Sequence, residues 1–156
     1  MEHRQKANFH VRRAVFSDAD AGLLDTLSHL SDLEGLAPQS AKEIMARIMS
    51  SGFDHRIFVA VTDDGSVIGT ATLLIEQKLI HNGGKVGHIE DVATREGYEG
   101  NGVGGAVVQA AIDFASEHGC YKVILDCSKK NEPFYEKLGF KARETEMRLN
   151  LPRKRD

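Results

Sequence analysis

Cysteine is scarce in this chain, and its two copies are poorly placed for bonding to each other. Cys120 and Cys127 are the two cysteines among 156 residues. They flank a predicted strand, and seven strand residues span about 23 Å, which is beyond the reach of a disulfide. Their spacing also lacks the pattern of a metal site. We therefore expect free thiols, a reducing compartment and no bound metal.

Long apolar runs and targeting motifs are also missing. No segment approaches the roughly 20 apolar residues of a membrane-spanning helix, and the start Met-Glu-His-Arg-Gln-Lys has no secretory pattern. The ending Arg-Lys-Arg-Asp matches neither a peroxisomal nor an endoplasmic-reticulum retention motif. These absences favour a cytoplasmic protein that does not contact membranes, with an organelle left open.

Repeats, low-complexity tracts and Pro/Ser-rich linkers do not occur, so we expect one domain over 1–156 with an ordered core at about 9–150. The composition, 41% apolar and 28% charged, is typical of globular proteins. A formal charge of −3 provides no general attraction to nucleic acid.

Hydrophobic periodicity and turn residues divide the chain into short elements. A helix is predicted to begin at Ser17 as its N-cap, and Thr62-Asp63-Asp64-Gly65 is typical of a hairpin turn. The expected strands are 9–15, 57–61, 67–75, 85–93, a buried one at 121–127 and a last one at 140–149. The other expected helices are 40–50, 103–118 and 131–138. This β-α-α-β-β-β-α-β-α-β order predicts an α/β fold with a single mixed central sheet flanked by helices.

The most informative stretch lies at 87–106, where a strand leads into a glycine-rich loop that opens a helix. Such a loop is typical of a phosphate-binding site. Gly100, Gly102 and Gly105 spell G-x-G-x-x-G, and Asp126 follows where a dinucleotide-binding fold has an acidic residue. That interpretation is disfavoured because about 50 residues follow, too few for the remaining βαβ units. A tight turn that merely starts a helix stays as the alternative for the loop alone.

The loop Glu99-Gly-Asn-Gly-Val-Gly104 resembles the pyrophosphate loop of the GNAT superfamily of N-acetyltransferases. This resemblance implies the GNAT fold and acetyl-coenzyme A as co-substrate. It implies that loop amides hold the pyrophosphate and that the preceding strand binds the pantetheine arm through its backbone. The implied cofactor-binding residues are Val92, Ala93, Thr94, Gly100, Asn101, Gly102, Val103, Gly104, Gly105 and Asn131.

Four further segments resemble the glucosamine 6-phosphate N-acetyltransferases of that superfamily. They are Lys78-Leu-Ile-His81, Gly87-His-Ile-Glu-Asp-Val-Ala93, Gly119-Cys-Tyr-Lys-Val-Ile-Leu-Asp-Cys127 and Phe134-Tyr-Glu-Lys-Leu-Gly-Phe140. The resemblance implies acetylation of the glucosamine 6-phosphate amine for UDP-N-acetylglucosamine synthesis. It also implies a homodimer that exchanges its C-terminal strand. Since no cysteine is placed for an acyl-enzyme, direct transfer in a ternary complex is expected.

Three side chains are the candidates for proton chemistry. We expect Glu90 to act on the amine through water, and Asp126 to position the amine or a hydroxyl. The resemblance assigns Tyr135 as the acid for the leaving thiolate. Adjacent strand residues face opposite ways, so Glu90 and Asp91 serve one face only if the strand bulges.

The remaining candidates concern the sugar phosphate. The substrate-binding set is Lys78, His81, Glu90, Asp91, Tyr121, Lys122 and Asp126. Two positions depart from the family pattern: Glu99 replaces a Gln or Arg, and Asn150 stands where a phosphate-binding arginine is expected, with Arg148 or Arg153 as replacements. An acetyltransferase for another amine and a non-catalytic coenzyme A binder remain as alternatives.

Overall fold

The computed structural model describes residues 6–51 and 54–153. Its contacts divide the chain into two compact units, Met1–Leu125 and Asp126–Asp156. The first unit contains β1 (Phe9–Arg13), η1 (Phe16–Ala19), α1 (Leu23–Ser28), α2 (Pro38–Ser50), β2 (Asp54–Thr62), β3 (Val67–Gln77), α3 (Ile80–Gly83), β4 (Lys85–Thr94), α4 (Val103–Glu117) and β5 (Cys120–Ile124). The second contains η2 (Lys129–Asn131) and α5 (Glu132–Glu136).

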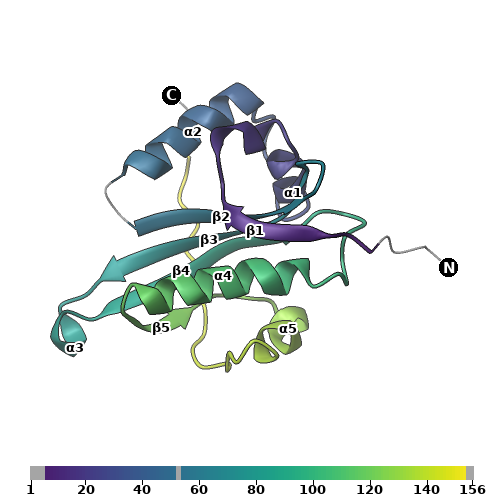
Figure 1. Ribbon diagram of the computed structural model, residues 1–156. Coiled ribbons are helices and arrows are strands. Elements are labelled where there is room, and N and C mark those ends of the chain that lie inside the picture. The colour runs from purple at the N-terminus through teal and green to yellow at the C-terminus, as the bar shows by residue number, and fades with distance from the viewer. Residues whose placement is uncertain (1–5, 52–53, 154–156) are drawn as a thin grey trace. The chain divides into compact units, whose positions relative to one another are not determined.

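The first unit is a five-stranded sheet in the order β1-β2-β3-β4-β5. Neighbours from β1 to β4 pair antiparallel, and β5 pairs parallel to β4. Figure 1 shows α1 and α2 on one face of this sheet and α4 on the other. The predicted α/β fold with one mixed sheet is confirmed.

Each face of the sheet buries its own cluster, because alternate side chains of a strand point to opposite faces. On one side Val59, Val61 and Val67 pack with Leu23 of α1 and Met45 of α2. On the other side the buried residues are Ala60, Ile68, Ala71, Val103 and Val107. Both layers of helix are therefore fixed on β2 and β3, the strands in the middle of the fold.

The helix predicted to begin at Ser17 does not form there. Residues Phe16–Ala19 make one 3-10 turn, and α1 begins only at Leu23, behind Gly22 with φ 109°. The reason is Asp18, which is 1% exposed. Its carboxylate accepts hydrogen bonds from both Nη atoms of Arg12 at 2.8 Å, and from the Val15 amide at 2.7 Å. The Asp18 carboxylate thus pairs with Arg12, six residues earlier, and caps the 3-10 turn at Val15, so no helix starts at Ser17.

The C-terminal predictions are partly wrong. The fifth strand ends at Ile124, not at residue 127, and it is an edge strand with Tyr121 42% and Ile124 41% exposed. Residues 140–149, predicted as a strand, have no regular structure. A strand is stable only when a neighbour satisfies its backbone, and no described strand pairs with this segment. The helix predicted over 131–138 is limited to η2 and α5.

Candidate active site

A bulge interrupts β4 at the acidic pair. Thr72 of β3 lies opposite Glu90, and Thr70 lies opposite Ala93, so three steps on β4 match two on β3. Asp91 lies in the bulge, and its φ of 50° is uncommon for a non-glycine residue. The sequence indicated that Glu90 and Asp91 could serve one face only if the strand bulged. This bulge is present.

The bulge also sets which way the neighbouring side chains point. Glu90 shares a row with Thr72 and Ile57, and Ile57 packs against the cluster on the α1 and α2 face. Directly paired residues share a face, so Glu90 lies on that face and is exposed. Val92 packs with Val107 on the α4 face. An unbulged strand would place residues 90 and 92 on the same face.

Beyond this point β4 has an open edge. Its pairing with β5 runs from Lys85 to His88, whereas β4 continues to Thr94. No described strand pairs with residues 89–94 on the β5 side. Their backbone donors and acceptors are therefore available to an extended ligand, which binds such an edge much as an added strand would. Val92, Ala93 and Thr94, the predicted pantetheine contacts, lie on this stretch.

The glycine loop connects the end of β4 to the N-terminus of α4. Gly97, Gly100 and Gly102 adopt φ of 87°, 77° and 78°, a region that glycine enters without steric cost. Val103, the first residue of α4, is 1% exposed and anchors the helix in the core. The first turn carries no acidic residue, and Gly102 offers no side chain to cap it. The amides of 103–105 are therefore suited to a phosphate.

Two side chains bind back onto the loop. Glu99 Oε2 accepts a hydrogen bond from the Gly97 amide at 2.8 Å. Asn101 Nδ2 donates to the Tyr98 carbonyl at 3.1 Å, and its Oδ1 accepts from the Ala7 amide at 3.4 Å. Glu99, which departs from the family pattern, thus uses its carboxylate to hold the turn. The Asn101 side chain is likewise structural.

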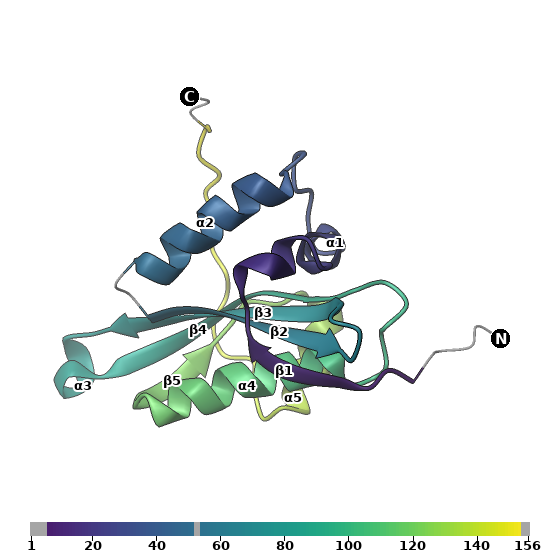
Figure 2. The same ribbon diagram turned by 45° about the horizontal axis from the view of Figure 1, so that its top comes forward.

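The β3–β4 hairpin, which ends in α3 and projects past the other strands in Figure 2, packs on the start of β5. The rings of His81 and Tyr121 lie 4.4 Å apart between centroids. The Lys122 Nζ lies 5.7 Å from the centroid of the Tyr121 ring. A Cβ on Gly84 would lie 2.7 Å from Cε1 of Tyr121, so glycine at this position leaves room for the ring. The structure therefore brings together three of the predicted substrate residues.

Lys78 is tied to the sheet through Glu76, a residue that sequence reasoning missed. Its Nζ lies 3.1 Å from Oε2 of Glu76, whose Oε1 lies 2.9 Å from Nε2 of His88. The hydrogen bond from His88, followed by that from Lys78, lowers the pKa of Glu76. The i, i+2 spacing of Glu76 and Lys78 at the end of β3 was a usable sign of this pair.

Asp126, Asn131 and Tyr135 belong to the second unit. The Tyr135 ring packs edge-on against Phe134 and Phe140, with centroids 4.8 and 5.9 Å away. Burial, with a smaller contribution from Cys127, raises the pKa of Tyr135. Its phenol is consequently protonated at neutral pH. Asn131 precedes α5 and makes no side-chain capping bond within the described residues.

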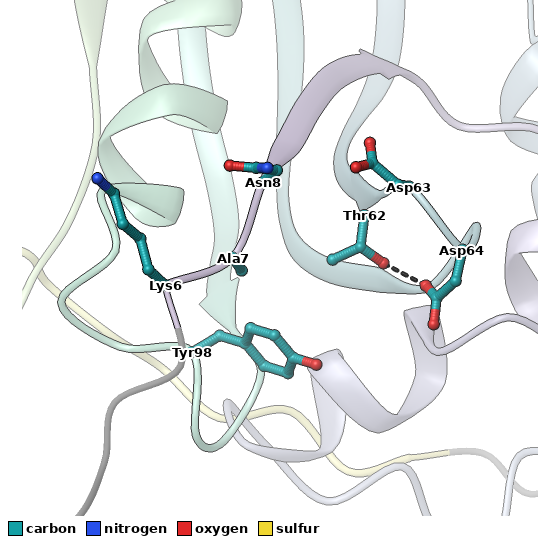
Figure 3. Close-up of a pocket in the computed structure, with 7 residues that line it drawn as sticks. All are labelled: Lys6, Ala7, Asn8, Thr62, Asp63, Asp64 and Tyr98. Atoms are coloured by element: carbon teal, nitrogen blue, oxygen red, sulfur yellow. Dashed lines mark hydrogen bonds between the residues drawn. The ribbon is translucent and has the colours of Figure 1, made fainter.

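A cavity of about 350 Å³ lies behind the glycine loop and contains none of the predicted site residues. In Figure 3 the Tyr98 hydroxyl points toward the Thr62–Asp64 turn, while the Lys6 amino group points away. The described part of the chain has no cluster of histidine, cysteine and acidic side chains arranged for a metal ion. Among residues 6–51 and 54–153, no helix combines the length and the apolar character needed to cross a bilayer.

Comparison with known proteins connects this geometry to a family. Residues 26–140 match the family described as acetyltransferase (GNAT) family. The chain belongs to the GNAT family. A glucosamine 6-phosphate N-acetyltransferase of Trypanosoma brucei brucei is 40% identical over 128 residues, covering 82% of this chain and 86% of the relative.

Solved GNAT structures agree with the fold. A crystal structure of glucosamine-6-phosphate N-acetyltransferase from Arabidopsis thaliana has a TM-score of 0.88 at 34% identity, covering 93% of this chain and 99% of that one. A predicted acetyltransferase of Clostridium acetobutylicum, solved with acetyl-CoA, has a TM-score of 0.70 at 19% identity, covering 92% and 96% of the two chains, and supports the GNAT fold alone. The resemblance found in the sequence is confirmed.

Proposed function

We propose that this GNAT protein transfers the acetyl group of acetyl-coenzyme A to the amine of glucosamine 6-phosphate. The observation that most directly supports this proposal is the bulge in β4. Exposed Glu90 lies at this bulge, beside an unpaired backbone edge of β4 that continues into the glycine loop. Similarity to relatives of that name over most of the chain supports the substrate. The product is N-acetylglucosamine 6-phosphate, for UDP-N-acetylglucosamine synthesis.

The proposed cofactor site follows the course of β4 into α4. Backbone groups of Val92, Ala93 and Thr94 bind the pantetheine arm along the open edge. The pyrophosphate rests on the loop and the α4 N-terminus, where amides and the helix dipole favour negative charge. The residues assigned there are Gly100, Asn101, Gly102, Val103, Gly104 and Gly105. Asn131 is assigned to the pantetheine arm.

The chemical step needs a free amine, a stabilised oxyanion and a protonated leaving group. Glu90 accepts the ammonium proton through water, and Asp126 orients the amine. The amine nitrogen then bonds to the acetyl carbon and gives up its second proton to water, and the carbon–sulfur bond breaks. Tyr135, which is protonated at neutral pH, donates to the thiolate. Its phenol is then restored by proton uptake from solvent, so the chain returns to its starting state.

The phosphate end is assigned to the hairpin and the start of β5. Lys78 and Lys122 supply positive charge, His81 supplies a hydrogen-bond donor, and Tyr121 braces His81. Asp91 is assigned to the sugar hydroxyls beside Glu90. Arg148 forms an ion pair with Glu146, at 2.6 Å between Nη2 and Oε1, so a role in phosphate binding requires that pair to open.

A homodimer is part of the proposal. Near the end of residues 140–149, two apolar side chains at alternate positions are left in solvent, with Met147 89% and Leu149 82% exposed. A strand contributed to a partner sheet would cover them and satisfy their backbone. We also propose one acetyltransferase domain over both units, supported by a family match that spans residues 26–140. A cytoplasmic location, with no metal, nucleic acid or membrane partner, completes the proposal.

The test is thiol release from acetyl-coenzyme A with a panel of amines: glucosamine 6-phosphate, glucosamine, a polyamine and an aminoglycoside. Release that is fastest with glucosamine 6-phosphate supports the proposal. Faster release with another amine would replace the substrate and keep the enzyme class. Binding of coenzyme A with no release from any amine would favour a non-catalytic binder.

A further inference from the structure

A series of three side chains joins the loop of the β3–β4 hairpin to the middle of β4. Glu76 lies at its centre, because its Oε2 accepts a hydrogen bond from Nζ of Lys78 at 3.1 Å and its Oε1 lies 2.9 Å from Nε2 of His88. Lys78 directly follows β3, whereas His88 lies in β4, opposite Leu74. Lys78 has a proposed role at the phosphate, but Glu76 and His88 have none in the reaction described above.

The register of the sheet places His88 between the two ends of the proposed substrate site. Val86, His88 and Glu90 occupy alternate positions of β4 before the bulge, so they point to the same face. The row of Val86 contains Glu76 and Lys122, at the proposed phosphate end. Glu90, at the proposed amine end, lies about 13 Å further along the strand. The row of His88 is midway between these two ends.

The carboxylate of Glu76 determines which ring nitrogen of His88 carries the proton. A hydrogen bond from His88, followed by one from Lys78, lowers the pKa of Glu76. The carboxylate is therefore ionised at neutral pH and only accepts hydrogen bonds, so Nε2 of His88 must be the donor. In a neutral ring Nδ1 is then an acceptor that is directed away from Glu76. Within 6–51 and 54–153, Nδ1 has no hydrogen-bond partner.

We infer that Nδ1 of His88 binds a ring hydroxyl of the sugar phosphate, and that Glu76 is a positioning residue that fixes the imidazole. The inference rests on the proposed function and adds a substrate contact to it. A substrate held by its amine near Glu90 and by its phosphate near Lys122 places one edge of the sugar ring at the row of His88.

The chemistry of Nδ1 decides which edge of the sugar it takes. One edge of glucosamine 6-phosphate, between the amine and the phosphate, carries the hydroxyls on C3 and C4. The other edge contains the ring oxygen, which has no proton to donate. An acceptor that is held in one orientation favours the edge with two hydroxyl donors. We therefore assign His88 to the hydroxyl on C3 or C4.

The experiment pairs a change in the protein with a change in the substrate. Thiol release gives kcat/KM for glucosamine 6-phosphate and for its 3-deoxy and 4-deoxy analogues. With the natural chain, one analogue should show a loss of about 3- to 10-fold, as expected for one hydrogen bond. In His88→Gln an amide nitrogen still reaches Glu76, but no atom replaces Nδ1, so the same analogue should lose less than about twofold. His10→Gln, at an exposed position of β1, is the matched control and should keep the full loss.

Two variants of Glu76 test the positioning role. Glu76→Gln keeps an acceptor for Nε2 of His88, whereas Glu76→Ala leaves the ring free to turn. The loss caused by the missing hydroxyl should persist in Glu76→Gln and shrink in Glu76→Ala. The KM for acetyl-coenzyme A should stay within about twofold in both, since the cofactor site is elsewhere on β4. A purely structural pair would lower the free energy of unfolding in Glu76→Ala and leave the analogue loss unchanged.

Equal analogue losses in the natural chain and in His88→Gln would overturn the inference, as would no loss with either analogue. Both results leave the proposed function in place. A reduced loss in His10→Gln would also contradict the assignment. No turnover of glucosamine 6-phosphate by the natural chain would instead reject the proposed function, and this contact with it. If His88→Gln does not fold, His88→Phe also removes Nδ1 and should abolish the same loss.

Discussion

The ring of His81 lies against the ring of Tyr121, with centroids 4.4 Å apart and planes inclined at 44°. This contact joins the tip of the β3–β4 hairpin to the first residues of β5. His81 accepts an unusual backbone conformation there, with φ 53°. Backbone strain of this kind persists only where the surroundings hold it. We therefore regard the hairpin tip as a fixed element of the proposed substrate site.

Replacing His81 by Ala should raise the KM for glucosamine 6-phosphate about 5- to 30-fold, since a charge-assisted contact to phosphate and the brace on Tyr121 are both lost. The KM for acetyl-coenzyme A should change less than twofold. The matched control is His29→Ala, an exposed histidine after α1. An unchanged KM for the sugar phosphate in steady-state assays would remove the hairpin from the site.

Gly69 permits the close packing of α4 on the sheet. A Cβ at this position would overlap Cγ1 of Val103, the first residue of α4. Gly69→Ala should therefore lower the free energy of unfolding by about 1–3 kcal/mol, and weaken acetyl-coenzyme A binding because the loop leading into the helix shifts. Denaturant titration and calorimetry measure the two effects. Adding Val103→Ala should cost less than the two single changes combined, and strict additivity would contradict the packing argument.

Glu99 places a carboxylate in the loop that we propose to bind the pyrophosphate. Glu99→Gln keeps an acceptor for the Gly97 amide and removes the charge, so acetyl-coenzyme A should bind about 2- to 3-fold more tightly at low salt. The gain should fade as salt is added. Glu99→Ala also loses the hydrogen bond and should bind more weakly than Glu99→Gln. Glu117→Gln, at the far end of α4, is the control. Equal affinity of both Glu99 variants at all salt concentrations would exclude this role.

Tyr135→Phe should lower kcat about 10- to 100-fold while acetyl-coenzyme A affinity is kept, because only the proton donor is removed. Tyr98→Phe is the control. A group that must be protonated loses activity only above its pKa. Since burial raises the pKa of Tyr135 above the ordinary value of about 10, the rate should not fall through this group between pH 7 and 9.5. Stopped assays across that range check this, and an alkaline fall that disappears in Tyr135→Phe would contradict it.

The parts of the fold that the sequence predicts well depend on local signals. The strand 85–94, the glycine loop and the helix from Val103 combine β-branched residues, positive-φ glycines and helical periodicity in one continuous segment. The sequence predicted a bulge at Asp91 only if Glu90 and Asp91 serve one face, because adjacent strand residues otherwise point to opposite faces. Family resemblance supplied the site residues that periodicity alone does not identify.

The parts that failed depend on side-chain and strand contacts that hydrophobic periodicity does not specify. Asp18 is drawn to Arg12, so the helix expected from Ser17 starts later. The segment 140–149 alternates like a strand but lacks a partner within the described chain. Glu76, the hydrogen-bond partner of His88, was missed because this pairing depends on the register of β3 and β4, which composition does not specify. Each failure reflects tertiary structure overriding a weak local preference.

The central claim is that the site selects the phosphorylated amino sugar, and one ratio tests it most directly. That ratio is kcat/KM for glucosamine 6-phosphate divided by kcat/KM for glucosamine, measured by thiol release at one acetyl-coenzyme A concentration. We predict a ratio of at least about 100, since two or more charge-assisted contacts to the phosphate would be lost with glucosamine. A ratio near one would contradict the account.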